Sequence, residues 1–174
     1  SPLTVGKQTI RNRVLITGHI PGLEEKGLVT DSFIAYHARR SKGGAGLQMS
    51  GTSRIHTTGH AHGGRGIDLT LPDVGVGLAK LAEAVHGEGG KFLIQLGHSA
   101  GTIDNGDIGQ PLLAPSAVQS DHIKVTPKEM SRAEIAELIE AYKNSTAVVR
   151  KAGLDGVEIL AAFGYLPGSF FSPL

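Results

Sequence analysis

The chain of 174 residues is long enough for one ordinary domain or for part of a larger one. Its 25 glycines lie between apolar runs and follow no collagen period or Gly/Ser tract, so neither a fibre nor a disordered chain is favoured. A net charge of +1 argues against a nucleic-acid partner, and the absence of cysteine excludes Cys-ligated metals. No apolar run approaches the roughly 20 residues of a membrane span, which argues against a membrane partner. Together these features favour a cytoplasmic protein.

Short apolar runs alternate with longer amphipathic segments along the chain. Residues 4–10 fit a small entry hairpin that turns at Gly6 and Lys7. The apolar runs predict buried strands at residues 13–17, 45–49, 91–96 and 156–160. The amphipathic segments predict helices that begin near residues 31, 73 and 131 and end near residues 43, 89 and 153.

Capping residues support these helix boundaries. Thr30 precedes the first helix and supplies N-cap chemistry, and Ser131 with Glu134 three residues later predicts a capping box for the third. Gly43 and Gly44 end the first helix, and Gly153 is a good C′ residue for the third.

The pattern predicts an α/β fold of about four βα units. The strands are continuous apolar runs, which is typical of a parallel sheet covered by helices. A doubly wound sheet and half of a (β/α)8 barrel both fit, and in both the long loops after the strands bind ligands. A complete barrel typically needs about 250 residues, so residues 1–174 account for only half of one.

Several stretches, taken in order, resemble the old yellow enzyme family of FMN-dependent oxidoreductases. They are NRVLITGHIPGLEE at residues 12–25, GGAGL at 43–47, AVH at 84–86, GGK at 89–91, QLGH at 95–98, APSA at 114–117 and GVEILAAFGYLP at 156–167. No single stretch is specific, but the ordered set covers essentially the whole chain. It is nearest to the branch of 2,4-dienoyl-CoA reductase and trimethylamine dehydrogenase. The resemblance implies the N-terminal half of a TIM barrel with FMN at its C-terminal mouth.

The resemblance assigns flavin contacts to residues that end the first three strands, namely Thr17, Gly18, His19, Gly51 and Gln95. A glycine such as Gly18 lets the main chain approach a flat ring closely. The Gln95 amide has both donors and acceptors, which suits the mixed edge of a flavin pyrimidine ring. Without the resemblance, a tight βα turn and a capped strand end would explain these two positions.

Tyr165 matches the family's proton-donating tyrosine, which protonates an activated alkene after the flavin delivers hydride to the neighbouring carbon. Leu160 and Phe163 stand where many members carry a His-x-x-His or His-x-x-Asn pair that holds the substrate's carbonyl oxygen. Neither side chain can donate a hydrogen bond. Two reactions of a small-molecule substrate therefore stay open: reduction of an unsaturated thioester or carbonyl with electrons from NAD(P)H, and oxidative N-demethylation of an amine.

Four histidines allow further interpretations. His98 follows the third strand and is expected either to contact substrate or to be a solvated loop residue. His56, His60 and His62 form a His-x3-His-x-His pattern that could bind zinc or copper. Only Asp68 lies nearby in the sequence to complete such a set, so we predict no metal site.

The resemblance also implies what an isolated half lacks. In the family, later loops bind the FMN phosphate, and any FAD or iron–sulfur cluster belongs to other parts of the protein. A four-stranded half exposes two sheet edges, so we expect weak or no FMN binding and association with a second copy or with the remainder of the barrel. The alternative to an enzyme is thus a catalytically incomplete half-barrel that acts only by such association.

Overall fold

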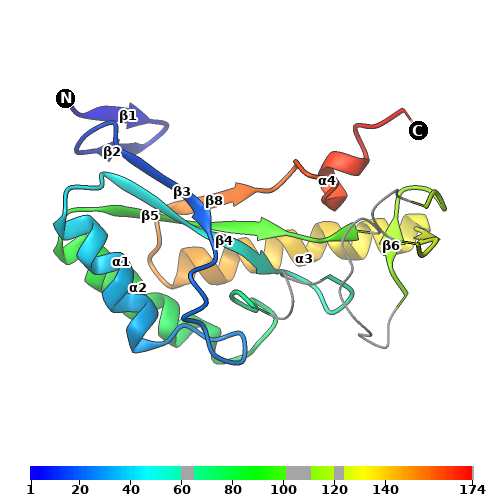
Figure 1. Cartoon of the computed structure of the whole chain (residues 1–174), viewed down its shortest axis with the longest axis horizontal. Coiled ribbons are helices and arrows are strands. Elements are labelled where there is room, and N and C mark those ends of the chain that lie inside the picture. Colours follow the sequence, from blue (N-terminus) through cyan, green and yellow to red (C-terminus); the bar gives the residue numbers. More distant parts are fainter. Residues whose placement is uncertain (60–64, 101–110, 120–123, 174) are drawn as a thin grey trace.

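The computed structural model describes residues 1–59, 65–100, 111–119 and 124–173. An antiparallel hairpin of β1 (Leu3–Val5) and β2 (Gln8–Ile10) precedes the main sheet. The main sheet is parallel, and its strands lie side by side in chain order (Figure 1): β3 (Leu15–His19), β4 (Leu47–Arg54), β5 (Lys91–Gly97) and β8 (Gly156–Ile159).

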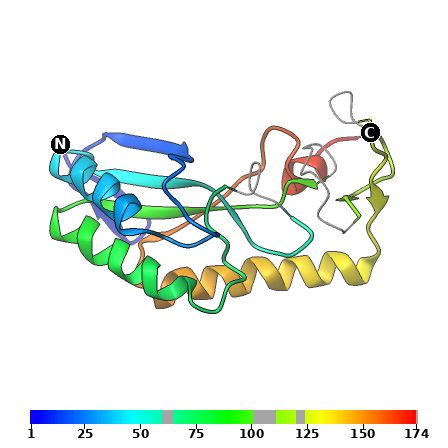
Figure 2. The same ribbon diagram turned by 60° about the horizontal axis from the view of Figure 1, so that its bottom comes forward.

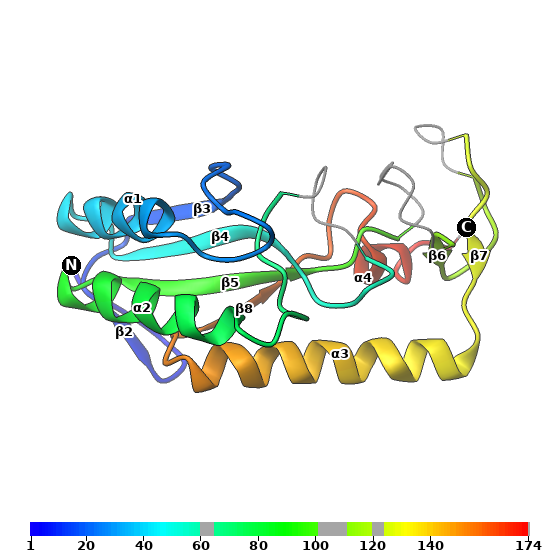
Figure 3. The same ribbon diagram turned by 90° about the horizontal axis from the view of Figure 1, so that it is seen from below.

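Three long helices connect these strands: α1 (Asp31–Lys42), α2 (Val74–Gly87) and α3 (Arg132–Lys151). They lie along the same side of the sheet (Figure 3), with α1 packed against α2 and α2 against α3. A doubly wound sheet carries helices on both faces, whereas a barrel carries them only outside. The strand order and the single helical layer therefore confirm a barrel segment, with four parallel strands joined by three long helices.

The helix boundaries follow the predicted caps. The Thr30 hydroxyl accepts the Phe33 N–H at 3.1 Å. Ser131 and Glu134 form the reciprocal capping box, in which the Glu134 carboxylate accepts the Ser131 N–H at 2.8 Å. Gly153 follows α3 with a φ of 82°, a conformation that glycine adopts at little cost.

Two strands are displaced from their predicted positions. β3 starts two residues late because the Asn12 side chain accepts the Val14 N–H at 3.0 Å, which forms a turn before the strand. β4 continues to Arg54 instead of ending at Met49, because Arg54 pairs with the backbone of residues 67–69. The loop that follows this strand therefore begins after Arg54.

Three short elements lie in segments predicted as loops. β6 (Leu113–Ala114) pairs in parallel with β7 (Lys128–Glu129), and α4 (Leu166–Ser169) follows β8. They gather at the end of the molecule toward which the sheet strands run (Figures 1 and 2). Elements of two to four residues are too short to produce a hydrophobic period in the sequence.

The main core lies between the sheet and its helices and includes Phe33, Leu78, Leu81, Phe92 and Ile94, all fully buried. The outer strands instead expose apolar side chains: Leu15 of β3 is 46% exposed and Ile159 of β8 is 55% exposed. Within the described residues, each of these two strands pairs on one side only. Among the same residues, no helix is both long and apolar enough to cross a bilayer.

Candidate functional site

A cavity of about 700 Å³ lies where the four sheet strands end. This volume is in the range of small-molecule sites, roughly 300–1,000 Å³. Its lining residues are Gly18, His19, Ile20, Gly51, Thr52, Arg65, Gln95, Leu160, Phe163 and Tyr165. The fold thus brings together most of the residues that the sequence assigned to flavin and substrate, and adds Ile20, Thr52 and Arg65.

Two glycines let the backbones of β3 and β4 approach each other beside this cavity. A Cβ on Gly18 would lie 2.7 Å from Gln95 Nε2, and a Cβ on Gly51 would lie 2.3 Å from Ile20 Cγ1. The pairing registers of β3 and β4 also shift next to these glycines. The two positions therefore exclude any side chain, because neighbouring protein atoms already occupy the space that a Cβ would take.

The Gln95 amide is held from both neighbouring strands. The Thr52 hydroxyl donates to Gln95 Oε1 at 2.9 Å, and Gln95 Nε2 donates to Glu158 Oε1 at 2.6 Å. An amide oxygen has two lone pairs and its nitrogen two hydrogens, so one of each remains for a ligand. The sequence analysis missed Thr52 and Glu158. The pairing register of the strands could have identified both residues, because Thr52 of β4 pairs with Gln95 of β5, and Gln95 pairs with Glu158 of β8.

The His19 side chain ties β3 to α1. Its Nδ1 donates to the Thr17 carbonyl oxygen at 3.1 Å, and its Nε2 lies 2.7 Å from the Tyr36 hydroxyl. Since Nδ1 carries the proton in this arrangement, neutral His19 accepts from Tyr36. Thr17 itself is exposed and is not among the lining residues, so its contribution in this structure is the carbonyl that orients His19.

Tyr165 is the residue just before α4 and is only 2% exposed. Its ring packs beside Gly97, where an added Cβ would lie 3.4 Å from two ring carbons. The next residue is anchored as well, because the Leu166 N–H donates to the His98 carbonyl oxygen at 2.8 Å. Tyr165 therefore sits in a tightly supported segment at the cavity wall.

His98 lies inside the protein and not at the cavity or in solvent. Its side chain is fully buried, Nδ1 accepts the Ala100 N–H at 3.2 Å, and Nε2 lies 3.0 Å from the Thr58 hydroxyl. Burial lowers the pKa of His98 to about 4, with a smaller contribution from nearby His56. The structure thus places His98 as a neutral internal hydrogen-bonding residue.

The histidine pattern in the loop after β4 is only partly covered by the structure. His56 Nδ1 lies 2.8 Å from the Thr58 hydroxyl, and His56 Nε2 lies 3.2 Å from Glu137 Oε1. His60 and His62 lie outside the described residues. Among those described, no three His, Asp or Glu side chains are grouped to hold a metal ion.

All 174 residues match the model of one protein family, described as the NADH:flavin oxidoreductase / NADH oxidase family. The chain is 37% identical to a metal reductase of Desulforamulus reducens over 176 residues, which are 100% of this chain and 26% of that protein. It is 33% identical to an NADPH dehydrogenase of Bacillus subtilis, covering 100% of this chain and 51% of that one. It is 30% identical to an N,N-dimethylglycine/sarcosine dehydrogenase of Chromohalobacter salexigens, and the match covers 99% of this chain and 25% of that protein.

Solved structures of related proteins have the same fold. Morphinone reductase superposes with a TM-score of 0.89 at 25% identity, over 99% of this chain and 50% of that one. A 2-naphthoyl-CoA reductase complex superposes with a TM-score of 0.90 at 27% identity, over 99% and 28%. The chain thus spans from about a quarter to about half the length of these relatives. By its full-length family match and its barrel segment, the chain belongs to the NADH:flavin oxidoreductase / NADH oxidase family.

Proposed function

We propose that this chain supplies the flavin-facing half of an FMN-dependent oxidoreductase. The observation that carries the proposal is the row Thr52–Gln95–Glu158 beside Gly18 and Gly51. The fixed amide has one N–H and one lone pair left, which match the mixed donor and acceptor edge of a flavin ring. Gly18 and Gly51 line the same cavity, and neither carries a side chain that would block a flat ligand. These residues fit the ring of FMN.

FMN, when bound, supplies hydride transfer, with NAD(P)H as the proposed source of electrons. Tyr165 lies in the same cavity wall and holds a proton at Oη, which it gives to the substrate carbon next to the one that accepts hydride. Leu160 and Phe163 line the cavity without a hydrogen-bonding group, so they offer the substrate apolar surface only.

We favour reduction of an unsaturated thioester or carbonyl over N-demethylation of an amine. Arg65 carries the one permanent charge among the described lining residues, and a cationic guanidinium disfavours a protonated amine nearby. The argument for the amine reaction is the 30% identity to the N,N-dimethylglycine/sarcosine dehydrogenase. The two reactions are distinguished by offering the flavin-loaded protein an enone with NADPH or an N-methyl amine with an electron acceptor.

A flavin titration tests the proposal directly. In the proposed site, the described residues contact the flavin ring and not the phosphate. We therefore expect lumiflavin, which lacks the ribityl phosphate, to bind about as well as FMN. Saturable quenching of flavin fluorescence by the 174-residue chain measures both affinities. Weak binding is expected of an isolated half, so the titration is carried to high flavin concentration. Absence of saturable quenching there, with a chain that is folded by circular dichroism, contradicts the proposal.

A second candidate function is a half-barrel that works only in association. Ile139 and Ile159 are both more than half exposed, and with Phe170 they line an apolar cavity of about 720 Å³ between α3, β8 and α4. Apolar surface of this kind is stabilised when another surface covers it. We propose the remainder of a barrel or a second copy as the partner. Light scattering combined with a flavin spectrum separates the two candidates, because stoichiometric FMN on a monomer contradicts the associative one.

A further inference from the structure

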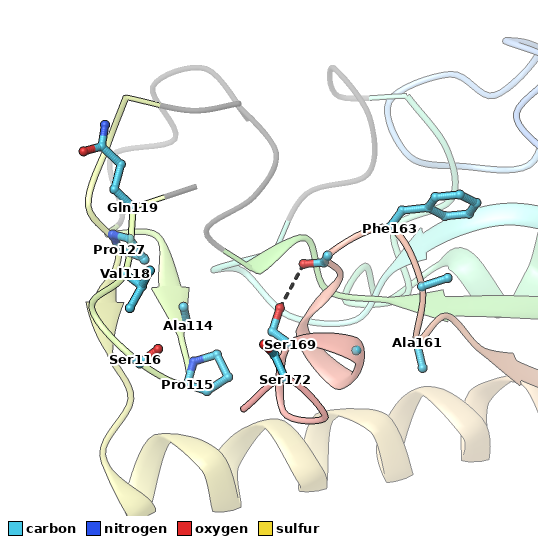
Figure 4. A pocket seen from close by; sticks show the side chains of 13 residues that line it. Ala114, Pro115, Ser116, Val118, Gln119, Pro127, Ala161, Phe163, Ser169 and Ser172 are labelled. Carbon is cyan, nitrogen blue, oxygen red and sulfur yellow. Dashed lines mark hydrogen bonds between the residues drawn. The ribbon is translucent and has the colours of Figure 1, made fainter. Parts of the chain in front are cut away.

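A second cavity, of about 410 Å³, adjoins the flavin-facing cavity. Figure 4 shows its two walls: Ala114, Pro115, Val118 and Gln119 on the side of β6, and the segment that carries Ala161 and Phe163 opposite. Phe163 lines both cavities. The two spaces are therefore neighbours across a single stretch of chain, residues 160–165.

Phe163 is placed unusually for an apolar residue. Its side chain is 87% exposed, and its φ of 55° lies in the left-handed region that non-glycine residues seldom adopt. Its ring points away from the wall that carries Val118 and Gln119 (Figure 4). Such a conformation persists only where surrounding structure holds it, and it is frequent at ligand sites. The segment that carries Phe163 thus lies between the two cavities, while its ring turns away from the second one.

The second cavity has an uncharged lining. Its polar side chains are those of Ser116, Gln119, Ser169 and Ser172, and the rest of its described lining is alanine, glycine, proline, valine and phenylalanine. The Ser169 hydroxyl is already used, since it donates to the Gly164 carbonyl oxygen at 3.1 Å. A charged group placed here would lose hydration without gaining an ionic partner among the described lining residues.

We propose that this second cavity is a substrate subsite that takes an uncharged, mainly apolar substituent, such as an alkyl group or alicyclic ring, on the compound reduced in the first cavity. The inference rests on the proposed function, since it extends that site. The segment of residues 160–165 sets the boundary between the reacting group and the substituent. The subsite selects neutral, branched substrates over unsubstituted or anionic ones.

Three probes that share one reacting group test the subsite: cyclohexenone, the same ring with an isopropyl group, and the same ring with a carboxylate. We measure their dissociation constants for the 174-residue chain by amide NMR, with and without FMN. The isopropyl compound is expected to bind roughly tenfold more tightly than cyclohexenone, as a filled apolar pocket allows. It should also shift the amide signals of Ala114 and Ala161. Equal affinities, tighter binding of the carboxylate or no binding of any probe would overturn the inference.

Variants separate the subsite from the flavin site. Val118→Trp fills the cavity and should abolish the isopropyl advantage, whereas Val125→Trp changes a similarly exposed valine outside the cavity and should keep it. Ser116→Phe, from the same wall, replaces Val118→Trp if that variant does not fold. Lumiflavin quenching should stay unchanged in all three. Loss of quenching in the wild type contradicts the proposed function, whereas an advantage that survives both cavity-filling variants contradicts only the subsite.

Discussion

The Thr58 hydroxyl lies 3.0 Å from His98 Nε2 and joins two histidines into one directed chain of hydrogen bonds. The Ala100 N–H donates to His98 Nδ1, so neutral His98 carries its proton on Nε2 and donates to Thr58. Thr58 then donates to His56 Nδ1, and His56 Nε2 faces the Glu137 carboxylate. The loop after β4 is in this way tied both to the end of β5 and to α3.

Replacing Thr58 by valine should destabilise the fold, because it leaves the buried Nε2–H of His98 without an acceptor. The expected loss is about 1–3 kcal/mol in the free energy of unfolding. Thr58→Ser keeps the hydroxyl and is expected to restore most of it. Urea unfolding at neutral pH measures both variants, and equal stability of the valine and serine proteins would refute the directed chain.

Stability should fall as pH decreases below neutrality. Burial lowers the pKa of His37 and of His98 to about 4, against 6.5 for an exposed histidine. Between these values the unfolded chain binds protons that the folded one does not, so stability is complete above about pH 6.5 and is lost towards pH 4. At pH 5 each residue should cost about 2 kcal/mol. Histidine signals followed by NMR provide the check: if His37 and His98 titrate near 6.5 in the folded protein, the expectation fails.

The sequence could predict the sheet strands and long helices because their signals are local. Ser131 and Glu134 are three residues apart, so their capping box is readable directly. The partners of Gln95 are different: Thr52 and Glu158 are 43 and 63 residues away and become neighbours only when strand registers are set. The same holds for His98, whose burial depends on packing against the Thr58 loop. Resemblance named most of the residues that meet at the cavity, but not the hydrogen bonds that position them.

Gly51→Ala should destabilise the protein through a clash. The new methyl group would lie 2.3 Å from Ile20 Cγ1 and 2.7 Å from the carbonyl carbon of His19, and backbone cannot move aside cheaply. We expect a loss of about 1–3 kcal/mol in the free energy of unfolding. Gly75→Ala is the control, because it adds a methyl group with no atom within 4 Å on a helix and should stabilise by up to about 1 kcal/mol. Similar denaturation midpoints for the two variants would contradict the close approach.

Gln95→Leu should weaken lumiflavin binding by at least about tenfold, since it removes the one fixed amide among the described lining residues and with it one or two hydrogen bonds. Gln48→Leu provides a contrast on the neighbouring strand. Gln48 is fully buried and bonded to His37 and Ser41, so its loss should lower stability and leave flavin affinity unchanged. The titrations are run below the unfolding transition of each variant. An affinity that responds equally to both changes would place Gln95 outside the flavin site.

Tyr165→Phe separates proton transfer from binding in the flavin-loaded protein. Phenylalanine keeps the ring that packs beside Gly97, so the fold and flavin affinity should be preserved. Without Oη, the substrate carbon must be protonated by water, and turnover of an enone should fall by roughly 100-fold or more. Reduction of the flavin by NADPH involves no proton from Tyr165, so stopped-flow measurement of that half-reaction should give the wild-type rate. A variant that is slow in flavin reduction but normal in reoxidation by the enone would assign Tyr165 to binding of the electron donor, and normal turnover in both halves would remove it from the reaction.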